Sequence, residues 1–243
     1  VFKGSIQQLL VHKNKLWISA DQSGLVSWDF QNEKLEIKDS SPVKDFLIDQ
    51  EFNLWISQSG QLRSSPLPIR RAFPELGIVR SVISAHDYLW AGTDKGVYQI
   101  FPEMDSTRLI VGTESLHVVA LYEDGNGDLW LGTMGNGGWK FNTESNHLSP
   151  LLTPSGEAYP HILSITGNGE QVWLATFGGA YHCRSSQEQV EHFQEADGLG
   201  ISYTYQTIRD AKDRIWFATD GQGAGIWQND ELHLIPELIH QSI

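Results

Sequence analysis

Asp128-Leu-Trp-Leu-Gly-Thr133 follows an acidic, glycine-rich turn, Glu123-Asp-Gly-Asn-Gly127, and precedes a second glycine-rich turn. The same pattern, a tryptophan between apolar residues with a small residue two places later, occurs six times in the 243 residues. A repeat of roughly 40 residues is the length of four short strands with their turns, which is typical of one β-propeller blade. The six tryptophans, at intervals of 35 to 43 residues, are Trp17, Trp55, Trp90, Trp130, Trp173 and Trp216.

The tryptophan strand is apolar on both sides. Successive side chains of a strand point to opposite faces, so the tryptophan and the small residue two places later share one face. The residues that flank the tryptophan, such as Leu129 and Leu131, occupy the other face. A strand that is apolar on both faces in every copy needs a neighbouring sheet packed on each face, as in blades stacked around an axis. This favours a propeller over a sandwich, with all six indoles buried between blades.

We therefore predict an all-β fold, a β-propeller of four-stranded antiparallel blades, in a single region spanning residues 1–243. In the fourth repeat the expected strands are about 116–122, 128–133, 138–142 and 146–152. The six visible repeats are expected to be part of a longer propeller array. Their approximate bounds are 1–40, 41–78, 79–115, 116–157, 158–200 and 201–243.

Turn residues give further local expectations. The second repeat is the least regular, because the prolines of Ser65-Pro-Leu-Pro68 donate no ladder hydrogen bond, so its outer strand should be short or shifted towards residues 70–73. Residues 238–243 resemble the opening of a seventh repeat. A glycine after each tryptophan strand is expected to adopt a positive φ. These glycines are Gly24, Gly60, Gly96, Gly137, Gly179 and Gly225.

Composition argues against several classes of function. Seventeen basic and 30 acidic residues give a formal net charge of −13, which opposes binding to nucleic acid or to an anionic membrane surface. A single cysteine, Cys183, excludes an intramolecular disulfide and gives no support for a thiolate-rich metal site. No stretch approaches the ~20 continuous apolar residues of a membrane-spanning helix. We expect neither nucleic-acid binding nor direct membrane contact.

The recurrent Leu-Trp-[Ile/Leu]-Gly-Thr pattern, with a glycine turn after it and an Asp/Gly-rich turn before it, resembles the two-component regulator propeller repeat. The best copies lie at residues 123–138, 89–96 and 214–225. Proteins of that family typically carry such propellers as periplasmic sensory regions of membrane-bound bacterial regulators. A β-sandwich module, a transmembrane helix and a histidine kinase or diguanylate cyclase commonly follow. The resemblance implies a periplasmic, non-catalytic sensor region of a receptor.

Candidate ligand-binding residues lie in the turns between second and third strands and in the connections that enter first strands. In a propeller these segments share one end of the blades and surround the channel mouth, where ligands usually bind. The aromatic residues come from adjacent repeats and suit a carbohydrate or another small polar organic ligand. The structural alternative is that these rings cap the blades or plug the channel. The candidates are Arg80, Asp94, Lys95, His117, Tyr159, His161, Phe177, Tyr203 and Tyr205.

One stretch has the spacing of metal ligands. Asp124-Gly-Asn-Gly-Asp128 copies the alternate oxygen ligands of a calcium loop. The twelfth position from Asp124 is Gly135 rather than a bidentate glutamate, so a tight polar turn is the favoured interpretation. The nine histidines do not cluster, and neither a nucleophile elbow nor a phosphate-binding loop is present. We expect no metal, no cofactor and no catalytic residue.

Three hypotheses follow from these observations. In the first, the propeller is a sensor that binds a small molecule or a protein partner and alters the output of a larger receptor. In the second, it is an enzyme similar to the streptogramin lyases, with His117 or His161 as the base of an elimination. In the third, it is a structural scaffold through which receptors form a homodimer.

Overall fold

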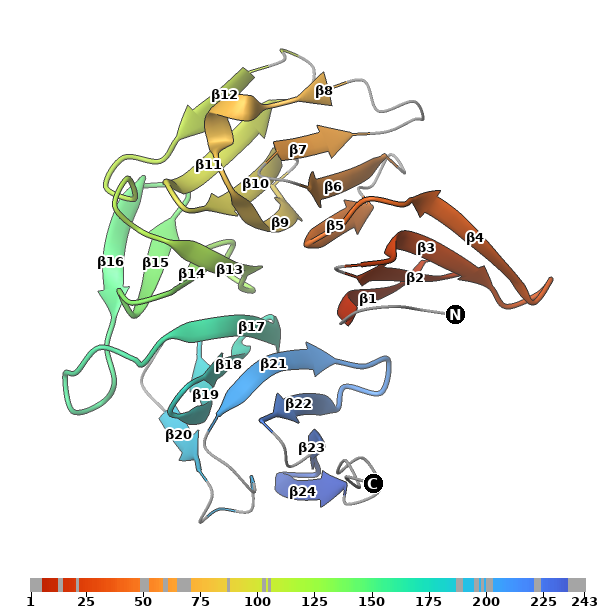
Figure 1. Cartoon of the computed structure of the whole chain (residues 1–243). Helices are drawn as coiled ribbons and strands as arrows, with labels where there is room; N and C mark the ends of the chain where they lie inside the picture. The colour runs from red at the N-terminus through yellow and green to blue at the C-terminus, as the bar shows by residue number, and fades with distance from the viewer. Residues whose placement is uncertain are drawn as a thin grey trace. The chain divides into compact units, whose positions relative to one another are not determined.

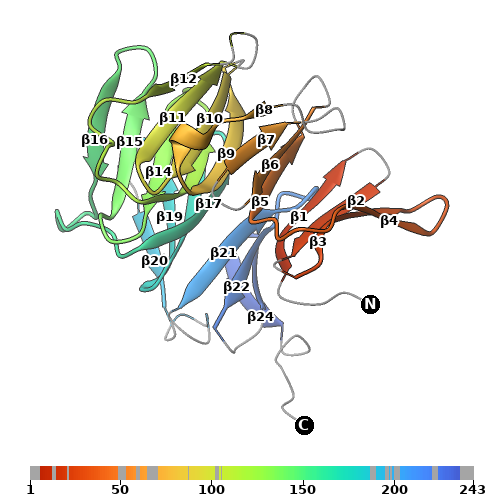
Figure 2. The same ribbon diagram turned by 45° about the horizontal axis from the view of Figure 1, so that its top comes forward.

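The computed structural model describes residues 6–12, 15–20, 22–48, 53–58, 61–64, 71–86, 88–101, 104, 106–186, 190–194, 197, 199, 203–220 and 224–235. These residues form six four-stranded antiparallel sheets (Figures 1 and 2). Every sheet follows chain order from first to fourth strand, as in a meander. The predicted fold, an all-β propeller with four-stranded blades, is confirmed. Gly60, Arg70 and residues 238–243, named above, lie outside the described residues.

Blade 1 contains β1 (Ile6–His12), β2 (Lys15–Ala20), β3 (Gly24–Asp29) and β4 (Lys34–Asp39). Blade 2 contains β5 (Asp45–Ile48), β6 (Leu54–Gln58), β7 (Gln61–Ser64) and β8 (Arg71–Ala72). Blade 3 contains β9 (Val79–Ala85), β10 (Tyr88–Thr93), β11 (Gly96–Phe101) and β12 (Ser106–Leu109), preceded by the short 3-10 helix η1 (Pro74–Leu76). The outer strand β8 is short and lies where the sequence predicts it.

Blade 4 contains β13 (Val118–Glu123), β14 (Leu129–Thr133), β15 (Gly138–Asn142) and β16 (His147–Leu151). Blade 5 contains β17 (Ile162–Asn168), β18 (Gln171–Thr176), β19 (Gly179–Arg184) and β20 (Val190–Phe193). Blade 6 contains β21 (Thr204–Arg209), β22 (Ile215–Thr219), β23 (Ala224–Gln228) and β24 (Glu231–Ile235). The strands of blade 4 agree with the predicted ranges to within about two residues at each end.

The chain divides into two compact units. Unit 1, Val1–Ser115, holds blades 1 to 3, and unit 2, Leu116–Ile243, holds blades 4 to 6. The boundary coincides with the predicted limit between the third and fourth repeats. That residues 1–243 constitute a single propeller region stays a prediction.

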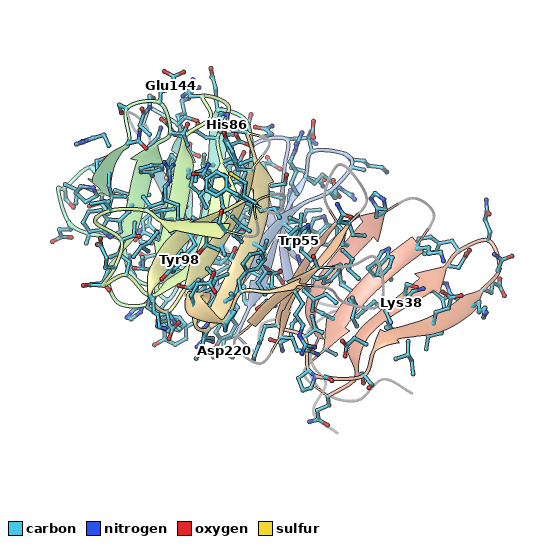
Figure 3. All side chains as sticks on the ribbon, turned by 90° about the horizontal axis from the view of Figure 1, so that it is seen from above. Lys38, Trp55, His86, Tyr98, Glu144 and Asp220 are labelled. Atoms are coloured by element: carbon cyan, nitrogen blue, oxygen red, sulfur yellow. The ribbon has the colours of Figure 1, made fainter. Side chains whose placement is uncertain are left out.

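Within each unit, the tryptophan of one blade packs against the next blade. Trp55 shares a buried cluster with Val79 and Val82 of blade 3, and in Figure 3 it is labelled among the side chains of that interface. Trp130 shares a cluster with Ile165 of blade 5, and Trp173 shares one with Phe217 of blade 6. This is the burial that the two-sided apolar pattern predicts.

The aliphatic residues beside each tryptophan pack the opposite way. Val172 and Leu174 lie in the cluster of Trp130, on the blade 4 side of β18. Leu54 and Ile56 lie with Leu25 of blade 1. The two faces of the tryptophan strand thus form the two interfaces of a blade, so most of the hydrophobic core lies between sheets.

Two of the six indoles are not fully buried, which corrects the sequence-based expectation. Trp17 packs against residues of blade 2 but is only partly buried. Trp216 is only partly buried and Ala218 is exposed, because their face of blade 6 points away from blade 5, against which the other face packs. The remaining four indoles are at most 3% exposed.

Gly225 is a second correction. It lies inside β23 opposite Phe217 and does not adopt a positive φ, because the extended strand begins one residue earlier, at Ala224. Gly96 shows the predicted role, with φ of 110°, and an added Cβ there would lie 2.6 Å from the Thr113 carbonyl oxygen. The other described glycines of the set with positive φ are Gly24, Gly137 and Gly179.

Candidate functional site

The turn after each tryptophan strand and the residue before each first strand meet at one end of the blade, here called the loop face. Three blades close this end with the same hydrogen bond, in which the first turn residue donates its N–H to the carbonyl of the residue before the first strand. Asp94 donates to Ile78 at 3.1 Å, Met134 to His117 at 2.9 Å, and Asp220 to Tyr203 at 3.0 Å. The repeat backbone therefore presents variable side chains at equivalent positions.

Four predicted residues of blades 5 and 6 form one aromatic cluster on the loop face. The ring centroid of Phe177 lies 5.3 Å from that of His161, 5.8 Å from Tyr203 and 6.3 Å from Tyr205. Tyr203 and Tyr205 remain 49% and 46% exposed. Edge-to-face packing holds the rings in place while it leaves surface for a ligand. Ligand binding by this cluster stays a prediction.

Tyr159 does not reach the loop-face surface. It is 3% exposed, its ring packs edge-to-face on Tyr181 at 4.9 Å, and its hydroxyl lies 3.7 Å from the Cys183 sulfur. Burial raises the pKa of the Tyr159 phenol and that of the Cys183 thiol, the latter to about 11. Tyr159 is a core residue at the interface of blades 4 and 5, so the expectation that its side chain is displayed on the loop face is wrong.

Two histidines at the loop face have buried nitrogens without a hydrogen-bond partner among the described residues. These atoms are Nε2 of His117 and Nδ1 of His161, and both residues precede the first strand of their blade. Buried polar groups normally have a partner, and those that lack one in a folded protein often mark a position for water or a ligand. The two side chains can each offer one donor or acceptor there, depending on the tautomer.

β-bulges place two further candidates. Arg80 is the extra residue between Val79 and Ser81 in β9, and Tyr205 is the extra residue between Thr204 and Gln206 in β21. A bulge bends its strand and re-aims the side chain of the extra residue. The same irregularity occurs in β1, β13 and β17, so it is a repeated device at the loop end of first strands.

Unit 1 carries the other predicted residues. Arg80 is half-buried, and its Nε has no partner among the described residues. Asp94 and Lys95 are exposed; the carboxylate of Asp94 accepts the Ile78 N–H at 2.7 Å, and the Lys95 N–H donates to Thr93 Oγ1. Asp94 is therefore committed in part to closing its turn.

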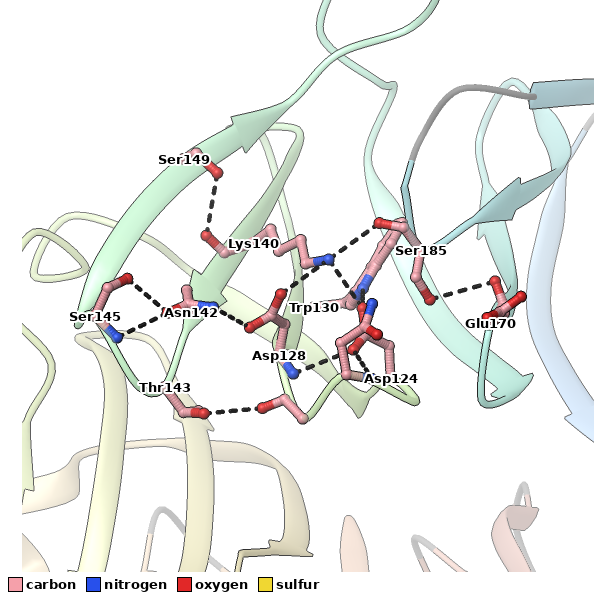
Figure 4. Close-up of polar contacts among 12 residues, drawn as sticks. Asp124, Asp128, Trp130, Lys140, Asn142, Thr143, Ser145, Ser149, Glu170 and Ser185 are labelled. Carbon is pink, nitrogen blue, oxygen red and sulfur yellow. Dashed lines mark hydrogen bonds and ion pairs between the residues drawn. The ribbon is translucent and has the colours of Figure 1, made fainter.

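The stretch with calcium-like spacing is a structural turn (Figure 4). Asp124 accepts the Trp130 indole N–H at 2.8 Å and the backbone N–H groups of Asn126 and Asp128. The ammonium of Lys140 lies 2.9 Å from Asp124 and 3.0 Å from Asp128. Both carboxylates thus share a side-chain cation, which supports the polar-turn interpretation. Among the described residues, no group of three or more metal-ligating side chains could hold a metal ion.

A groove that the sequence does not predict lies at the end of blades 5 and 6 opposite the loop face. Its aromatic wall is formed by Trp173, His182 and Trp227. The sequence pattern marks Trp227 only as a packing position and His182 as one of nine scattered histidines. Their juxtaposition depends on how the two blades pack, for which the sequence holds no local signal.

Comparisons with known proteins connect this geometry to a family. A family model described as "Two component regulator propeller" matches residues 112–135. The match includes His117, all of β13 and β14, and the turn from Asp124 to Asp128. The matched segment, which includes the first two strands of blade 4, is similar to a two-component regulator propeller repeat. No curated protein matches the chain by sequence.

Solved structures share the propeller fold. The extracellular domain described as belonging to the one component system BT4673 of B. thetaiotaomicron superposes with a TM-score of 0.60 at 16% identity, over 96% of this chain and 41% of that chain. The corresponding domain of the hybrid two component system BT3049 gives 0.54 at 21% identity, over 93% and 34%. Virginiamycin B lyase from Staphylococcus aureus gives 0.75 at 12% identity, over 95% and 84%.

These identities show a shared fold alone. The chain spans 41% and 34% of the two B. thetaiotaomicron domains, but 84% of the lyase. The described part of the chain contains no helix with the length and apolar character required to cross a membrane.

Proposed function

We propose that this chain is the extracytoplasmic sensor propeller of a bacterial signal-transduction receptor, located in the periplasm, with no catalytic role of its own. The observation that carries the proposal is the two-component regulator propeller repeat at residues 112–135, within an array of blades of the same type. Similar folds occur in extracellular domains of two bacterial regulatory systems. The receptor would transmit the signal through parts beyond the propeller and through a change in its homodimer.

The loop face supplies the recognition surface of this proposal. Its centre is the cluster of His161, Phe177, Tyr203 and Tyr205, with His117 on the adjacent blade. Aromatic faces and polar ring atoms suit a small organic ligand with both apolar and hydrogen-bonding surfaces, such as a carbohydrate. A protein partner that inserts a side chain among these rings is the other form of the same proposal.

The test is a ligand screen with a matched pair of tyrosine variants. Oligosaccharides and other small organic compounds are added to the chain, and the shift in Tm is measured. A hit should bind the Tyr205→Ser variant about fivefold more weakly, because one aromatic contact contributes roughly 1 kcal/mol. The control is Tyr88→Ser, since Tyr88 is 41% exposed and packs edge-to-face on Phe101, but lies away from the loop face.

An equal loss in both variants would show that the binding is not at the loop face. A flat response to a broad library, together with no partner in a pull-down with the intact chain, would contradict the sensor proposal.

The lyase alternative retains support from two observations. The fold resembles virginiamycin B lyase with a TM-score of 0.75, and buried nitrogens of His117 and His161 lack partners among the described residues. A neutral imidazole with a free nitrogen is the usual general base. Incubation with quinupristin, the compound in a structure of the inactive lyase, tests it by chromatography. Conversion that disappears in His117→Ala or His161→Ala would favour the enzyme over the sensor.

A further inference from the structure

A groove with a volume of about 820 Å³ lies between blades 5 and 6 in unit 2. Apart from Pro154, in the connection between β16 and β17, its lining residues lie in or near the β17–β18, β19–β20, β21–β22 and β23–β24 turns. These turns are at the opposite end of the blades from the loop face, so the groove is separate from the aromatic cluster described above. Its volume falls in the range of sites for small molecules, about 300–1,000 Å³.

The inner wall of the groove is aromatic. The imidazole of His182 lies parallel to the Trp173 indole, with ring centroids 3.9 Å apart and an interplanar angle of 2°. The indole of Trp227 comes from blade 6, 5.2 Å from Trp173 and 6.1 Å from His182. Trp173 is buried, whereas His182 and Trp227 are partly exposed, and all three rings line the groove.

Hydrogen bonds hold this wall in one conformation. Nδ1 of His182 lies 3.0 Å from the Glu191 carboxylate, and Nε2 is hydrogen-bonded to Oε1 of Gln171. Trp173, His182 and Glu191 are register partners on three adjacent strands. A ligand that enters the groove would therefore meet a preorganised surface, which reduces the entropic cost of binding.

The mouth of the groove is acidic. Glu191, Asp213 and Asp230 line it with one formal cation, Arg184. The side chains of Glu191 and Asp213 are 60% and 65% exposed. Asp213 pairs with Arg209 and Glu191 with His182, so Asp230 and the π-faces carry much of the remaining attraction for a cation. The formal charge of −13 for the whole chain acts in the same direction.

We propose that this groove binds a small organic ammonium ion, with its charged group between the Trp227 indole and the carboxylates of Glu191 and Asp230. Indole faces attract ammonium groups within about 6 Å of the ring, and carboxylates at the mouth add ionic attraction. Ile215 and Val190 line the same groove and offer apolar surface for the carbon chain of the ligand. This site does not depend on the loop-face proposal.

The experiment uses the intact chain and three probes: 1,5-diaminopentane, tetramethylammonium, and the neutral 1,5-pentanediol. Binding is measured by calorimetry and by tryptophan fluorescence. The amine is expected to bind with saturation, and the diol is expected to bind at least about tenfold more weakly. Raising the ionic strength should weaken amine binding, because exposed charges are screened. Equal binding of the diol, or absence of saturable binding by both cations, would overturn the proposal.

A matched pair of double variants locates the site. Glu191→Gln with Asp230→Asn removes two groove carboxylates, while glutamine keeps an acceptor for His182. The Kd for the amine should rise about tenfold, since each exposed charge pair contributes up to roughly 1 kcal/mol. Glu114→Gln with Glu144→Gln removes the same charge from exposed positions outside the groove (Glu144 in Figure 3) and should leave the Kd unchanged. Equal changes in both doubles would mean nonspecific attraction and would reject the site.

Discussion

In two blades, an aspartate in the turn before the tryptophan strand accepts a hydrogen bond from the tryptophan indole, and so connects the turn to the side chains between the blades. Asp124 binds the Trp130 indole N–H, and Asp210 binds that of Trp216 at 2.9 Å. Burial alone would raise the pKa of Asp124, but hydrogen bonds from Trp130 and Lys140 outweigh it and lower the pKa. For Asp210, hydrogen bonds from Arg214 and Trp216 lower the pKa. Each carboxylate satisfies an N–H that would be costly to leave unpaired.

Replacement of Trp130 tests how much a buried indole stabilises a blade. Trp130→Ala should lower the free energy of unfolding by about 3 to 5 kcal/mol, because it opens a large cavity and removes the indole N–H that Asp124 accepts. Trp216→Ala is the control, since Trp216 is only partly buried and its replacement should cost less. Urea denaturation followed by fluorescence or circular dichroism measures both. A loss below about 1 kcal/mol for Trp130→Ala would contradict the packing role.

Asp45 predicts a pH dependence of stability. Its carboxylate accepts the N–H groups of Val82 and Phe46, but burial dominates and raises the pKa from 3.8 to about 7. Below pH 3.8 the carboxyl is protonated in both states. Between pH 3.8 and about 7 the unfolded chain loses this proton while the folded chain keeps it, so stability falls as pH rises, then levels off.

Comparison with Asp45→Asn isolates this effect. Between pH 5 and pH 8 the wild type should lose about 1 to 3 kcal/mol of stability relative to the variant, which has no titrating group at residue 45. Parallel stability curves for the two proteins across this range would show that Asp45 does not titrate in the folded chain as proposed.

Neighbouring blades approach each other closely at the small residue two places after the tryptophan in blades 2 and 4. An added Cβ at Gly132 of β14 would lie 2.8 Å from both the carbonyl oxygen and the Cγ2 of Ile162 in β17. At the equivalent place in β6, Ser57 donates its hydroxyl to the Val79 carbonyl at 2.6 Å. In blades 2 and 4 the position therefore controls the spacing of two sheets, which explains why small residues occupy it there.

The side chain of Lys140 connects blade 4 to blade 5. Its ammonium contacts Asp124 and Asp128 and donates to the Ser185 carbonyl at 3.0 Å, and its side chain is 13% exposed. Lys140→Met should lower the free energy of unfolding by about 3 kcal/mol at neutral pH, because two carboxylates would remain buried without their cation. Equilibrium urea unfolding of both proteins at pH 7 gives this difference.

Lys38→Met is the matched control, since Lys38 lies over the Trp17 ring at 5.8 Å much as Lys140 lies over Trp130 at 5.6 Å, but its ion pair is with Glu36, whose side chain is 33% exposed. It should cost less than about 1 kcal/mol. The difference between the two lysine variants should shrink as pH falls and the carboxylates protonate. A cost that stays constant down to pH 3 would argue against the ionic clamp.

The division into two compact units predicts which residues lose protection from amide hydrogen exchange when a core tryptophan is replaced. The cluster of Trp55 contains residues of unit 1 alone, and that of Trp173 contains residues of unit 2 alone. We expect Trp55→Ala to accelerate amide hydrogen exchange mainly in residues 1–115, and Trp173→Ala mainly in residues 116–243. Exchange followed by mass spectrometry measures this. Uniform acceleration over both units in each variant would show that the chain opens as one cooperative body.

Much of the fold could be predicted because its determinants are local. The strand period of two places Trp130 on one face and Leu131 on the other, and the turn residues mark where each strand ends. The repetition of this pattern then implies the number of blades, and the loop-face positions of His161, Phe177, Tyr203 and Tyr205 follow from it. The short outer strand β8 was predictable for the same reason, since two prolines precede it.

The remaining features, which are side-chain partners, burial and the groove, depend on packing between blades. This packing brings together residues that are distant in the chain, and no local sequence pattern indicates that they meet. Lys140 meets Ser185 at a separation of 45 residues, and Asp45 meets Val82 at a separation of 37. The burial of Tyr159 and the groove beside His182 and Trp227 depend on the same contacts. Alternation along a strand specifies which way a side chain points, whereas its exposure, partners and pKa depend on the sheet that covers it.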